Sequence, residues 1–365
     1  MTRTPVRVVL TAAALALGTV LASCTAPSTT PDAPTSATAE PTVAPLSLGE
    51  PEVVTNGLEA PWSIVSLRGV PLVSERDTAQ VLELGADGSS RVVGGIDGVL
   101  ARGESGLLGL AVYQDRLYAY STGRDGNRIQ RFEVTGEAGA LQLGPAETLL
   151  DGLPSASYHD GGRIAFGPDG MLYATVGDAG RSERAQDLDS LGGKILRMTP
   201  DGTVPDDNPY PGSLVYSSGH RNPQGIAWAE DGTFFATEFG QDTWDELNII
   251  TPGANYGWPT VEGIAEDDRF VDPVQQWGPD EASPSGMAEI GGTLFLANLR
   301  GQVLRAVPVD APSTSTDHAV GEFGRLRDVT VAEDGRLWVA TSNTDGRGDP
   351  ETDDDRILSF SLEND

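Results

Sequence analysis

The sequence predicts an all-β fold, a six-bladed β-propeller made of four-stranded antiparallel blades. After residue 46, long helical patterns give way to short runs of alternating apolar and polar residues, bounded by Gly, Asp, Asn and Pro. One unit, two such runs joined by a tight turn, recurs six times at intervals of roughly 40 to 60 residues, as blades of a propeller do. A β-sandwich would explain the strands but not their regular recurrence.

The six hairpin units follow one another along the chain. They span residues 64–73, 110–119, 164–174, 226–236, 287–297 and 329–340. In the clearest copy, Asp169 and Gly170 join the two runs, and Asp-Gly between alternating apolar residues is a strong hairpin signal. Radial closure hides strand edges that would otherwise promote aggregation. We expect the run 356–362 to pair with N-terminal strands and close the ring.

The N-terminus has the pattern of a lipoprotein signal peptide. Arg3 and Arg7 precede an apolar run, residues 8–21, which is too short to span a bilayer. Small residues then lead to Cys24, the only cysteine in the sequence, in a quartet similar to the bacterial lipobox. An ordinary signal peptide with an incidental cysteine is the alternative. We expect residues 1–23 to be a signal peptide and Cys24 to carry a lipid that anchors an extracytoplasmic protein to the outer face of the bacterial cell membrane.

The residues after the lipidated cysteine form a predicted tether. Residues 24–46 are almost all Ala, Pro, Ser and Thr, a composition that cannot bury enough apolar surface to fold. We therefore expect a disordered tether there and the propeller domain over residues 47–365. The chain has 24 Lys and Arg against 54 Asp and Glu, a formal net charge of −30. This balance excludes nucleic acid as a partner, because such binding needs a basic face. We expect membrane contact only through the lipid anchor.

Two glycine-rich motifs before strand-like runs carry two of the three histidines in the sequence. They read His159-Asp160-Gly161-Gly162-Arg163 and Gly219-His220-Arg221-Asn222-Pro223-Gln224-Gly225. Glycine permits backbone conformations that bring side chains close to a ligand. Several residues fall at equivalent ends of their units and are expected to converge at one mouth of the central channel: His159, Asp178, Arg221, Asn222, Gly240, Arg325 and Arg327. The alternative is a set of polar loop residues on a solvated rim.

These motifs together resemble those of the soluble glucose/sorbosone dehydrogenase family, in particular the aldose sugar dehydrogenases that use pyrroloquinoline quinone (PQQ). The likeness runs from about Gly57 to the C-terminus. It includes Gly177-Asp178, Asp245-Glu246-Leu247-Asn248, Asn255-Tyr256-Gly257-Trp258-Pro259, Arg325-Leu326-Arg327-Asp328 and residues 106–111. The resemblance implies a PQQ- and Ca²⁺-dependent enzyme that oxidises an aldose at its anomeric carbon to the lactone.

The resemblance also implies catalytic roles for individual residues. His159 matches the general base that takes the proton of the anomeric hydroxyl as hydride passes to PQQ, a task that suits a neutral imidazole. Asp178 matches the carboxylate that holds this ring. Arg221 matches a cation beside the quinone carbonyls, where it would stabilise developing negative charge. His220 is expected to be structural.

The cofactor-binding residues implied by the resemblance come from several units. They are Glu104, His159, Arg221, Asn222, Arg300, Arg325 and Arg327. Arg325 and Arg327 are two apart on a predicted strand, so they share a face and would bind PQQ carboxylates together. Glu104 stands where relatives carry a polar residue, often Gln. A carboxylate beside an anionic quinone would need a cation or a proton.

Calcium is the metal that the resemblance implies. In the family, two successive backbone carbonyls bind the cofactor Ca²⁺, and these match Gly240 and Gln241. Glu246 and Tyr256 match part of a second, structural calcium site, with a surface acid as the alternative for Glu246. The family pattern Glu-His-Gly reads Glu-Phe-Gly in this chain, with Phe239 at its centre.

Two further functions stay open on the sequence alone. A calcium-dependent lactone hydrolase would coordinate its metal through a ring of carboxylates and asparagines. A non-catalytic ligand-binding propeller would leave His159 and Asp178 idle. The arginines and histidines among the candidate residues favour an anionic cofactor over both. The preferred sugar, the natural electron acceptor and the oligomeric state do not follow from the sequence.

Overall fold

A computed structural model describes residues 46–364 of the chain. The predictions for residues 1–23 and for Cys24 lie outside the described residues, as does almost all of the predicted tether. The first strand, β1 (Leu46–Leu48), begins one residue before the expected start of the propeller. Among residues 46–364, no helix is long and apolar enough to cross a membrane.

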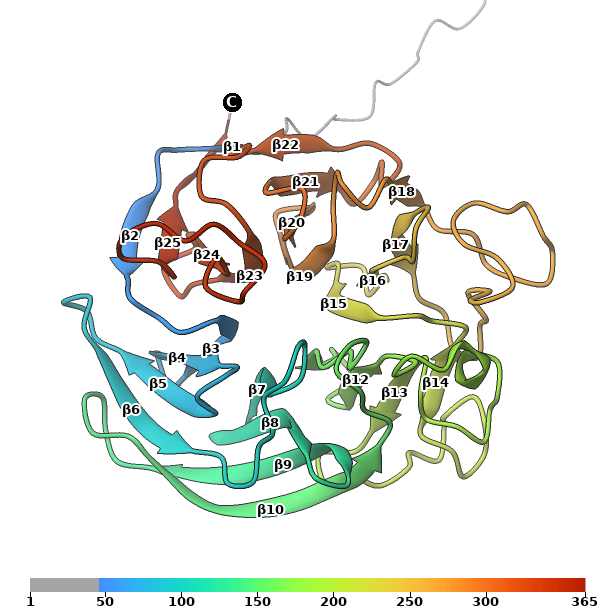
Figure 1. The fold of residues 1–365 in the computed structure, drawn as a ribbon, viewed down its shortest axis with the longest axis horizontal. Coiled ribbons are helices and arrows are strands. Elements are labelled where there is room, and N and C mark those ends of the chain that lie inside the picture. The colour runs from blue at the N-terminus through green and yellow to red at the C-terminus, as the bar shows by residue number, and fades with distance from the viewer. Residues whose placement is uncertain (1–45, 365) are drawn as a thin grey trace, which may run out of the picture. The chain divides into compact units, whose positions relative to one another are not determined.

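Six four-stranded antiparallel sheets stand around a common centre and confirm the predicted six-bladed propeller (Figure 1). Blade 1 contains β3 (Pro61–Leu67), β4 (Val70–Glu75), β5 (Gln80–Leu84) and β6 (Ser90–Gly95). Blade 2 contains β7 (Leu107–Tyr113), β8 (Arg116–Gly123), β9 (Gly126–Thr135) and β10 (Gln142–Leu153). Blade 3 contains β11 (Ile164–Phe166), β12 (Leu172–Val176), β13 (Lys194–Met198) and β14 (Val215–Ser218), with a short 3₁₀ helix, η1 (Ser182–Ala185), between β12 and β13.

The second half of the chain repeats the same arrangement. Blade 4 contains β15 (Pro223–Trp228), β16 (Phe234–Glu238), β17 (Asp245–Ile249) and β18 (Gln275–Trp277). Blade 5 contains β19 (Pro284–Ile290), β20 (Thr293–Asn298), β21 (Leu304–Pro308) and β22 (Thr316–His318). Blade 6 contains β23 (Leu326–Val331), β24 (Leu337–Thr341), β25 (Ile357–Phe360) and, from the other end of the chain, β2 (Glu52–Thr55).

The two ends of the described chain close the ring together, as expected. Strand β2 completes blade 6 by pairing antiparallel with β25, with Val53 opposite Leu358. Strand β1 pairs with β26 (Leu362–Asn364) in a separate two-stranded ribbon. The last blade is therefore built from both halves of the sequence, which explains why the sixth unit shows only three strands of its own.

The Asp-Gly turns fold for an identifiable reason. Gly170, Gly232 and Gly335 have φ values of 73°, 87° and 79°, in the left-handed region that glycine enters without strain. The aspartate before each glycine accepts a hydrogen bond from the backbone N–H two residues on, at 2.8 to 3.1 Å. Each turn thus joins the innermost two strands of its blade.

A buried ion pair crosses the centre of the ring. Arg163, just before β11, contacts Asp328 of β23 at 2.9 Å, and its Nε donates to the carbonyl of Gln224 in β15. Asp328 also accepts the backbone N–H of Ile64 in β3 at 2.8 Å. The guanidinium lies 4.3 Å from the ring of Trp62. These contacts join the innermost strands of four blades, and they hold the loops of the site in a fixed relation.

Candidate active site

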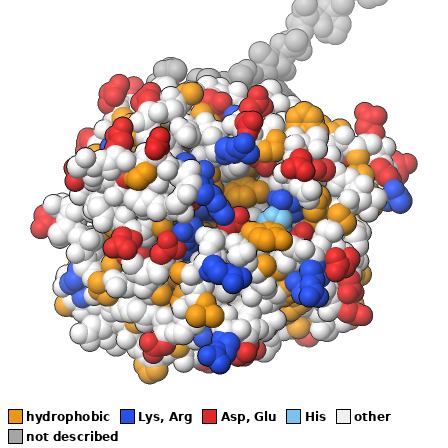
Figure 2. Space-filling view, viewed as in Figure 1, with side chains coloured by type: hydrophobic (Ala, Val, Ile, Leu, Met, Phe, Trp, Pro, Cys, Tyr) orange, Lys and Arg blue, Asp and Glu red, His pale blue; other side chains and the backbone are white. Residues whose placement is uncertain are grey.

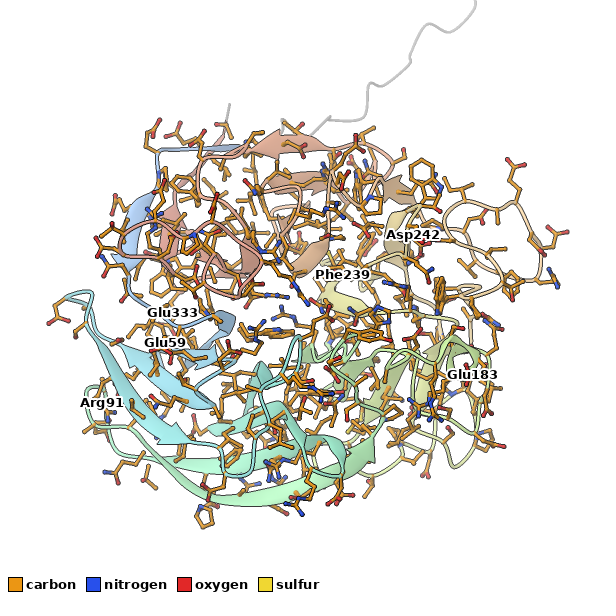
Figure 3. The ribbon with its side chains drawn as sticks, viewed as in Figure 1. Glu59, Arg91, Glu183, Phe239, Asp242 and Glu333 are labelled. Atoms are coloured by element: carbon orange, nitrogen blue, oxygen red, sulfur yellow. The ribbon has the colours of Figure 1, made fainter. Side chains whose placement is uncertain are left out.

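A hollow lies at the centre of the face shown in Figure 2, where a histidine and hydrophobic side chains are bordered by basic residues. The hydrophobic border includes Phe239, which lies near the centre of the ring (Figure 3). Its side chain lines a cavity together with those of Arg221 and Trp258. His159 precedes blade 3, Arg221 and Asn222 together precede blade 4, and Arg325 precedes blade 6, as the positions of their hairpin units predict.

His159 lies in a backbone turn that only neighbouring glycines make possible. Its φ is 59°, and Gly161 and Gly162 follow with φ of 66° and 100°. A Cβ on Gly177, at the end of β12, would lie 2.0 Å from the carbonyl oxygen of His159. Glycine at position 177 therefore lets the strand that leads to Asp178 pass directly against the backbone of His159.

Asp178 fixes the tautomer of His159. The distance from His159 Nδ1 to Asp178 Oδ1 is 2.8 Å, and Asp178 also accepts hydrogen bonds from Trp258 Nε1 at 2.9 Å and from the Gly180 N–H at 2.7 Å. Burial alone would raise the pKa of Asp178, but these hydrogen bonds outweigh it and lower the pKa below its ordinary value. The ionised carboxylate makes Nδ1 the donor, which leaves Nε2 of His159 able to accept a proton.

Asn222 connects the loops that carry the site. Its side chain is fully buried, its Oδ1 accepts the Gly161 N–H at 3.0 Å, and its Nδ2 lies 3.4 Å from Glu104. Arg221 donates from Nη1 to the carbonyl of Phe239 at 3.1 Å, and its guanidinium lies 5.5 Å from the ring of Trp258. Position 239, where the family pattern has histidine, therefore orients Arg221 through its backbone.

A cation lies beside Glu104, as a carboxylate near an anionic quinone would need. One carboxylate oxygen accepts the backbone N–H of His159 at 2.9 Å, and the other lies 3.5 Å from Nη2 of Arg347. Arg347 was not among the residues selected from the sequence. Glu104 thus holds the backbone of His159 in place while Arg347 balances its charge.

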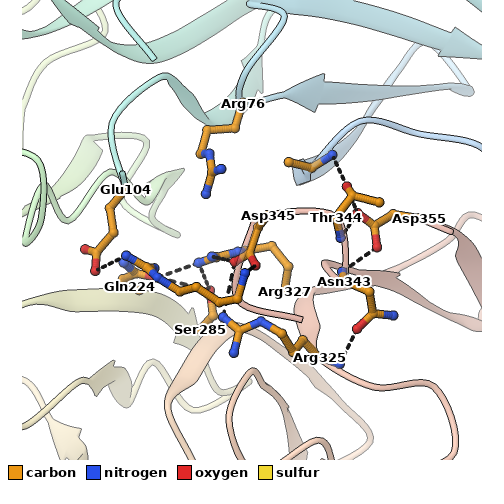
Figure 4. Close-up of polar contacts among 12 residues, drawn as sticks. Arg76, Glu104, Gln224, Ser285, Arg325, Arg327, Asn343, Thr344, Asp345 and Asp355 are labelled. Carbon is orange, nitrogen blue, oxygen red and sulfur yellow. Dashed lines mark hydrogen bonds and ion pairs between the residues drawn. The ribbon is translucent and has the colours of Figure 1, made fainter. Parts of the chain in front are cut away.

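Three buried guanidinium groups, those of Arg76, Arg325 and Arg327, form what we call the arginine cluster (Figure 4). Nη1 of Arg327 donates to Gln224 Oε1 at 2.8 Å. Burial lowers the pKa of Arg327 to about 9, because the charge of Asp345 only partly offsets the loss of water. The nearby charges of the other two arginines contribute to this lowering. The cluster therefore holds more positive charge than the protein itself balances.

Arg76 and Asp345 were missed by the sequence analysis, although a signal for them exists. Asp178 was selected because it follows a hairpin unit. Arg76 follows the first unit and Asp345 the sixth, so the same rule applies to them. Arg300, in contrast, is not brought to this group. Its side chain is 60% exposed and forms an ion pair with Asp280 in the connection between β18 and β19.

The calcium-site candidates lie beside Arg221. One cavity is lined by Gly240, Glu246 and Tyr256 together with Arg221 and Trp258. A Cβ on Gly240 would lie 1.7 Å from a backbone oxygen, so glycine is required there. The N–H groups of Gly240 and Gln241 donate to Asp245 and Glu262 at 2.9 and 2.6 Å, whereas neither carbonyl accepts a hydrogen bond from the described residues.

Glu246 is buried, so the alternative of a surface acid is wrong. Its carboxylate accepts the Gly263 N–H at 2.7 Å and Asn248 Nδ2 at 3.0 Å. Burial, with the nearby carboxylate of Glu238, raises its pKa well above its ordinary value. The Tyr256 hydroxyl donates to the Ile249 carbonyl at 2.7 Å. Within residues 46–364, no three His, Cys, Asp or Glu side chains form a group able to hold a metal.

His220 is structural, as expected. Its ring is fully buried, lies 2.9 Å from Glu238 and 2.8 Å from the Ser217 hydroxyl, and stacks on Tyr256 at 4.8 Å between ring centres. Glu238 in turn accepts the backbone N–H of Asn222 at 3.2 Å. His220 thus supports the loop of the second motif and leaves His159 as the histidine of the hollow.

The sequence matches the Glucose / Sorbosone dehydrogenase family over residues 58–349. The chain belongs to this family. Among solved structures, the PQQ-bound form of aldose sugar dehydrogenase from Streptomyces coelicolor is 48% identical, with a TM-score of 0.84, over 88% of this chain and 99% of that one. An aldose sugar dehydrogenase of Escherichia coli is 28% identical over 81% of this chain and 90% of that protein. Quinoprotein glucose dehydrogenase B of Acinetobacter calcoaceticus is 34% identical over 54% of this chain, and the match spans only half of that protein.

The site of this glucose/sorbosone dehydrogenase contains the imidazole of His159, the cationic side chain of Arg221 and the buried guanidinium groups of the arginine cluster. Nε2 of His159 is able to accept a proton while Asp178 stabilises the resulting charge. The arginine cluster presents donors suited to carboxylates. The site therefore has an imidazole nitrogen able to accept a proton and guanidinium donors able to hold an anion.

Proposed function

We propose that the chain is a PQQ- and Ca²⁺-dependent dehydrogenase that oxidises an aldose at the anomeric carbon to its lactone, with His159 as the general base. The observation that carries this proposal is that the His159–Asp178 pair and the arginine cluster lie close together, because Glu104 accepts the His159 N–H and pairs with Arg347 of the loop that reaches Arg325. The PQQ-bound relative that is 48% identical along nearly its whole length supports the cofactor.

The residues present fit a polycarboxylate such as PQQ. The Nε atoms of Arg221, Arg325 and Arg327 are buried and have no hydrogen-bond partner among the described residues. Buried donors without partners are costly, so a site that collects three of them is suited to a ligand rich in acceptors. Arg325 and Arg327 would hold ligand carboxylates, and Arg221 would face the part of the ligand nearest His159.

The side chains of the site then have distinct tasks. PQQ, when bound, supplies the hydride acceptor, and the protein supplies the base, charge and orientation. His159 takes the hydroxyl proton on Nε2, since Asp178 occupies Nδ1. Asp178 stays ionised and stabilises the imidazolium that results. The guanidinium of Arg221, which lies 5.5 Å from the ring of Trp258, would stabilise negative charge that develops in the hollow.

Calcium would bind next to Arg221 through the backbone carbonyls of Gly240 and Gln241. Both carbonyls are free of hydrogen bonds from the described residues, and oxygen is the ligand that Ca²⁺ prefers. A second calcium ion near Glu246 would displace the proton that burial favours on that carboxylate. Neither site depends on a cluster of acidic side chains.

The lactone hydrolase and the non-catalytic propeller are less well supported. A hydrolase of that kind would need side-chain carboxylates around its metal, and the described residues contain no such group. A binding module would have no need for the hydrogen bonds that hold the His159–Asp178 pair in one tautomer.

Reconstitution tests the proposal. The full-length protein is loaded with PQQ and Ca²⁺, and dye reduction is followed with a panel of aldoses. We expect sugar-dependent reduction, its loss in His159→Gln, and a decrease of at least about a hundredfold in Arg221→Ala. Chelation of Ca²⁺ should abolish the activity, and added Ca²⁺ should restore it.

Each control addresses one part of the proposal. Activity that survives His159→Gln would refute the assignment of the base. Retention of PQQ absorbance through gel filtration should persist in His159→Gln, because this variant keeps the arginine cluster. Absence of PQQ from the wild-type protein after gel filtration would favour the binding module.

The proposal includes an extracytoplasmic location through a lipid on Cys24. It is supported by the signal pattern of the N-terminal sequence. Mass spectrometry of the membrane fraction should find a lipidated Cys24, and Cys24→Ser should release the protein. An unmodified cysteine would refute this part. The electron acceptor remains to be identified by assays on membranes and soluble fractions.

A further inference from the structure

The loop between β24 and β25 places a carboxylate inside the arginine cluster. Asp345 Oδ2 lies 3.2 Å from Nη2 of Arg325 and 3.9 Å from Nη2 of Arg327, and the Asp345 side chain is fully buried (Figure 4). Asp345 Oδ1 accepts the backbone N–H of Arg347 at 2.9 Å. Both oxygens of this carboxylate are therefore held in place.

The fold itself sets the position of Asp345. Asp355, at the far end of the same loop, accepts hydrogen bonds from the Asn343 N–H at 2.5 Å, the Thr344 hydroxyl at 2.6 Å and the Thr341 hydroxyl at 3.0 Å. Asp355 is itself buried. These bonds link the two ends of the loop, so the fold holds Asp345 in a fixed position within the arginine cluster.

The charges around Asp345 do not balance. Four guanidinium groups face three carboxylates here: Arg76, Arg325, Arg327 and Arg347 against Asp77, Glu104 and Asp345. One positive charge is left over. Among residues 46–364, Asp345 is the one carboxylate within ion-pair distance of Arg325 or Arg327. Burial opposes its ionisation, but the charges of these two arginines outweigh it and lower the pKa of Asp345.

Asp345 uses only part of what the two arginines offer. It contacts Nη2 of each, whereas Nε of Arg325 and Nε of Arg327 are buried with no partner among the described residues. A guanidinium binds a carboxylate best through two parallel donors. The cluster therefore has unused donors directly beside a carboxylate of its own.

We propose that Asp345 determines how much negative charge the arginine cluster accepts, by competing with the carboxylates of a bound polycarboxylate for Arg325 and Arg327. The inference rests on the proposed function for the identity of that ligand, PQQ. When no anion is bound, the carboxylate of Asp345 reduces the repulsion between the guanidinium groups of the cluster. Because it occupies donors of Arg325 and Arg327, it also weakens the binding of any anion. Asp345 is thus a selectivity residue that does not take part in the reaction.

Binding measurements on the full-length protein test this proposal. In Asp345→Asn, the amide oxygen still accepts the Arg347 N–H, but the negative charge is gone. We expect the dissociation constant for PQQ, measured by quenching of protein fluorescence, to fall at least about tenfold, because a hydrogen bond to a charged group changes affinity by that factor or more. Citrate should protect the variant from thermal unfolding at concentrations at least about tenfold lower than the wild type needs.

Asp349→Asn is the matched control. It removes the same charge from the same loop, at an exposed position, and should bind both anions as the wild type does. Equal affinities in Asp345→Asn and Asp349→Asn, or weaker binding in Asp345→Asn, would refute the inference even if the enzyme is active. Tighter citrate binding in Asp345→Asn without PQQ binding by either protein would support the inference and refute the proposed cofactor.

A second pair of variants keeps the test decisive if Asp345→Asn does not fold. Arg325→Gln removes the excess positive charge, and adding Asp345→Asn to it restores that excess. The double variant should therefore bind PQQ and citrate more tightly than Arg325→Gln alone. Equal or weaker binding by the double variant would overturn the inference.

Discussion

At the scale of single residues, the hydrogen bonds around Asp160 fit a carboxyl group that carries a proton at mildly acidic pH. The Ser105 hydroxyl lies 2.6 Å from the Ala156 carbonyl and 2.8 Å from Asp160 Oδ2, yet it has one hydrogen to donate. Asp160 Oδ1 already accepts from Asn127 and from the Ala156 N–H. Both contacts of Ser105 are satisfied if Asp160 donates to Ser105 and Ser105 donates to Ala156. Burial raises the pKa of Asp160 to about 6, so the carboxyl group carries this proton below about pH 6.

We expect Asp160→Asn to fold and to flatten the pH dependence of stability between pH 4 and 6. An unfolded Asp titrates near ~3.9. The native state therefore binds more protons than the unfolded state in this window, and stability falls as the pH rises through it, by up to about 3 kcal/mol in total. Asparagine keeps the network, because its amide N–H donates to Ser105. Urea unfolding at pH 4, 5, 6 and 7 measures the effect.

The exposed Asp349→Asn variant should keep the wild-type slope over the same pH range. If Asp160→Asn also keeps it, Asp160 does not carry the proton. A variant that cannot donate, Asp160→Ala, should be less stable than Asp160→Asn at every pH, because Asn127 and Ser105 lose their partner.

At the scale of elements, two glycines near β12 are needed for different reasons: Gly170 for a turn conformation and Gly177 for a close backbone contact. Gly170 lies in the turn before β12 with φ of 73°, and a Cβ there would come no closer than 3.5 Å to Tyr113. Gly177 lies at the other end, where a Cβ would lie 2.0 Å from the His159 carbonyl. A Cβ at position 170 would strain only the turn itself. A Cβ at position 177 would displace the backbone of His159, the proposed base.

We expect Gly170→Ala to cost about 1 kcal/mol of stability and to leave activity near the wild-type level, since only a backbone conformation is disfavoured. Gly177→Ala should lower kcat at least about a hundredfold, because displacing a catalytic group by about 1 Å can have that effect. Steady-state kinetics and urea unfolding of both variants measure this contrast. A Gly177→Ala enzyme with normal kcat would show that the close approach does not position His159.

The elements also show why the sequence predicted part of the site and missed the rest. His159, Asp178 and Arg221 sit next to hairpins whose alternation and Asp-Gly turns are visible in the sequence, so the fold prediction located them. Asp345 follows the sixth hairpin unit as Asp178 follows the third, but its importance depends on a contact with arginines about twenty residues away, which the alternation does not show. Arg300 was placed by a loose loop likeness, and its side chain points to a solvent-exposed partner instead.

At the scale of the whole molecule, ring closure is the feature that the sequence predicted only in outline. The pairing of the N-terminal and C-terminal strands was expected, but the register was not. It places β2 on the outside of β25, with Val54 packed against the core between blades 1 and 6. Outer strands such as β18 and β22 are three residues long and leave almost no pattern. Inner strands are thus predictable from sequence, whereas outer strands depend on the assembled blade.

We expect a chain that begins at residue 56 to lose stability and to associate, because removal of β1 and β2 exposes the hydrogen-bonding edge of β25. A chain that begins at Leu46 keeps both strands and serves as the control. Light scattering after gel filtration and thermal unfolding compare the two. A monomeric shorter chain with an unchanged unfolding temperature would show that packing between the blades alone closes the ring.

The β1–β26 ribbon has a practical consequence. It brings residues 46 and 364 side by side at the perimeter of the ring (Figure 1), whereas the hollow opens at the centre of the face shown in Figure 2. A resin or an electrode coupled at either of these positions would hold the protein by its edge and leave the opening free for small molecules. We therefore expect the immobilised protein to have the same activity whether it is coupled at residue 46 or at residue 364.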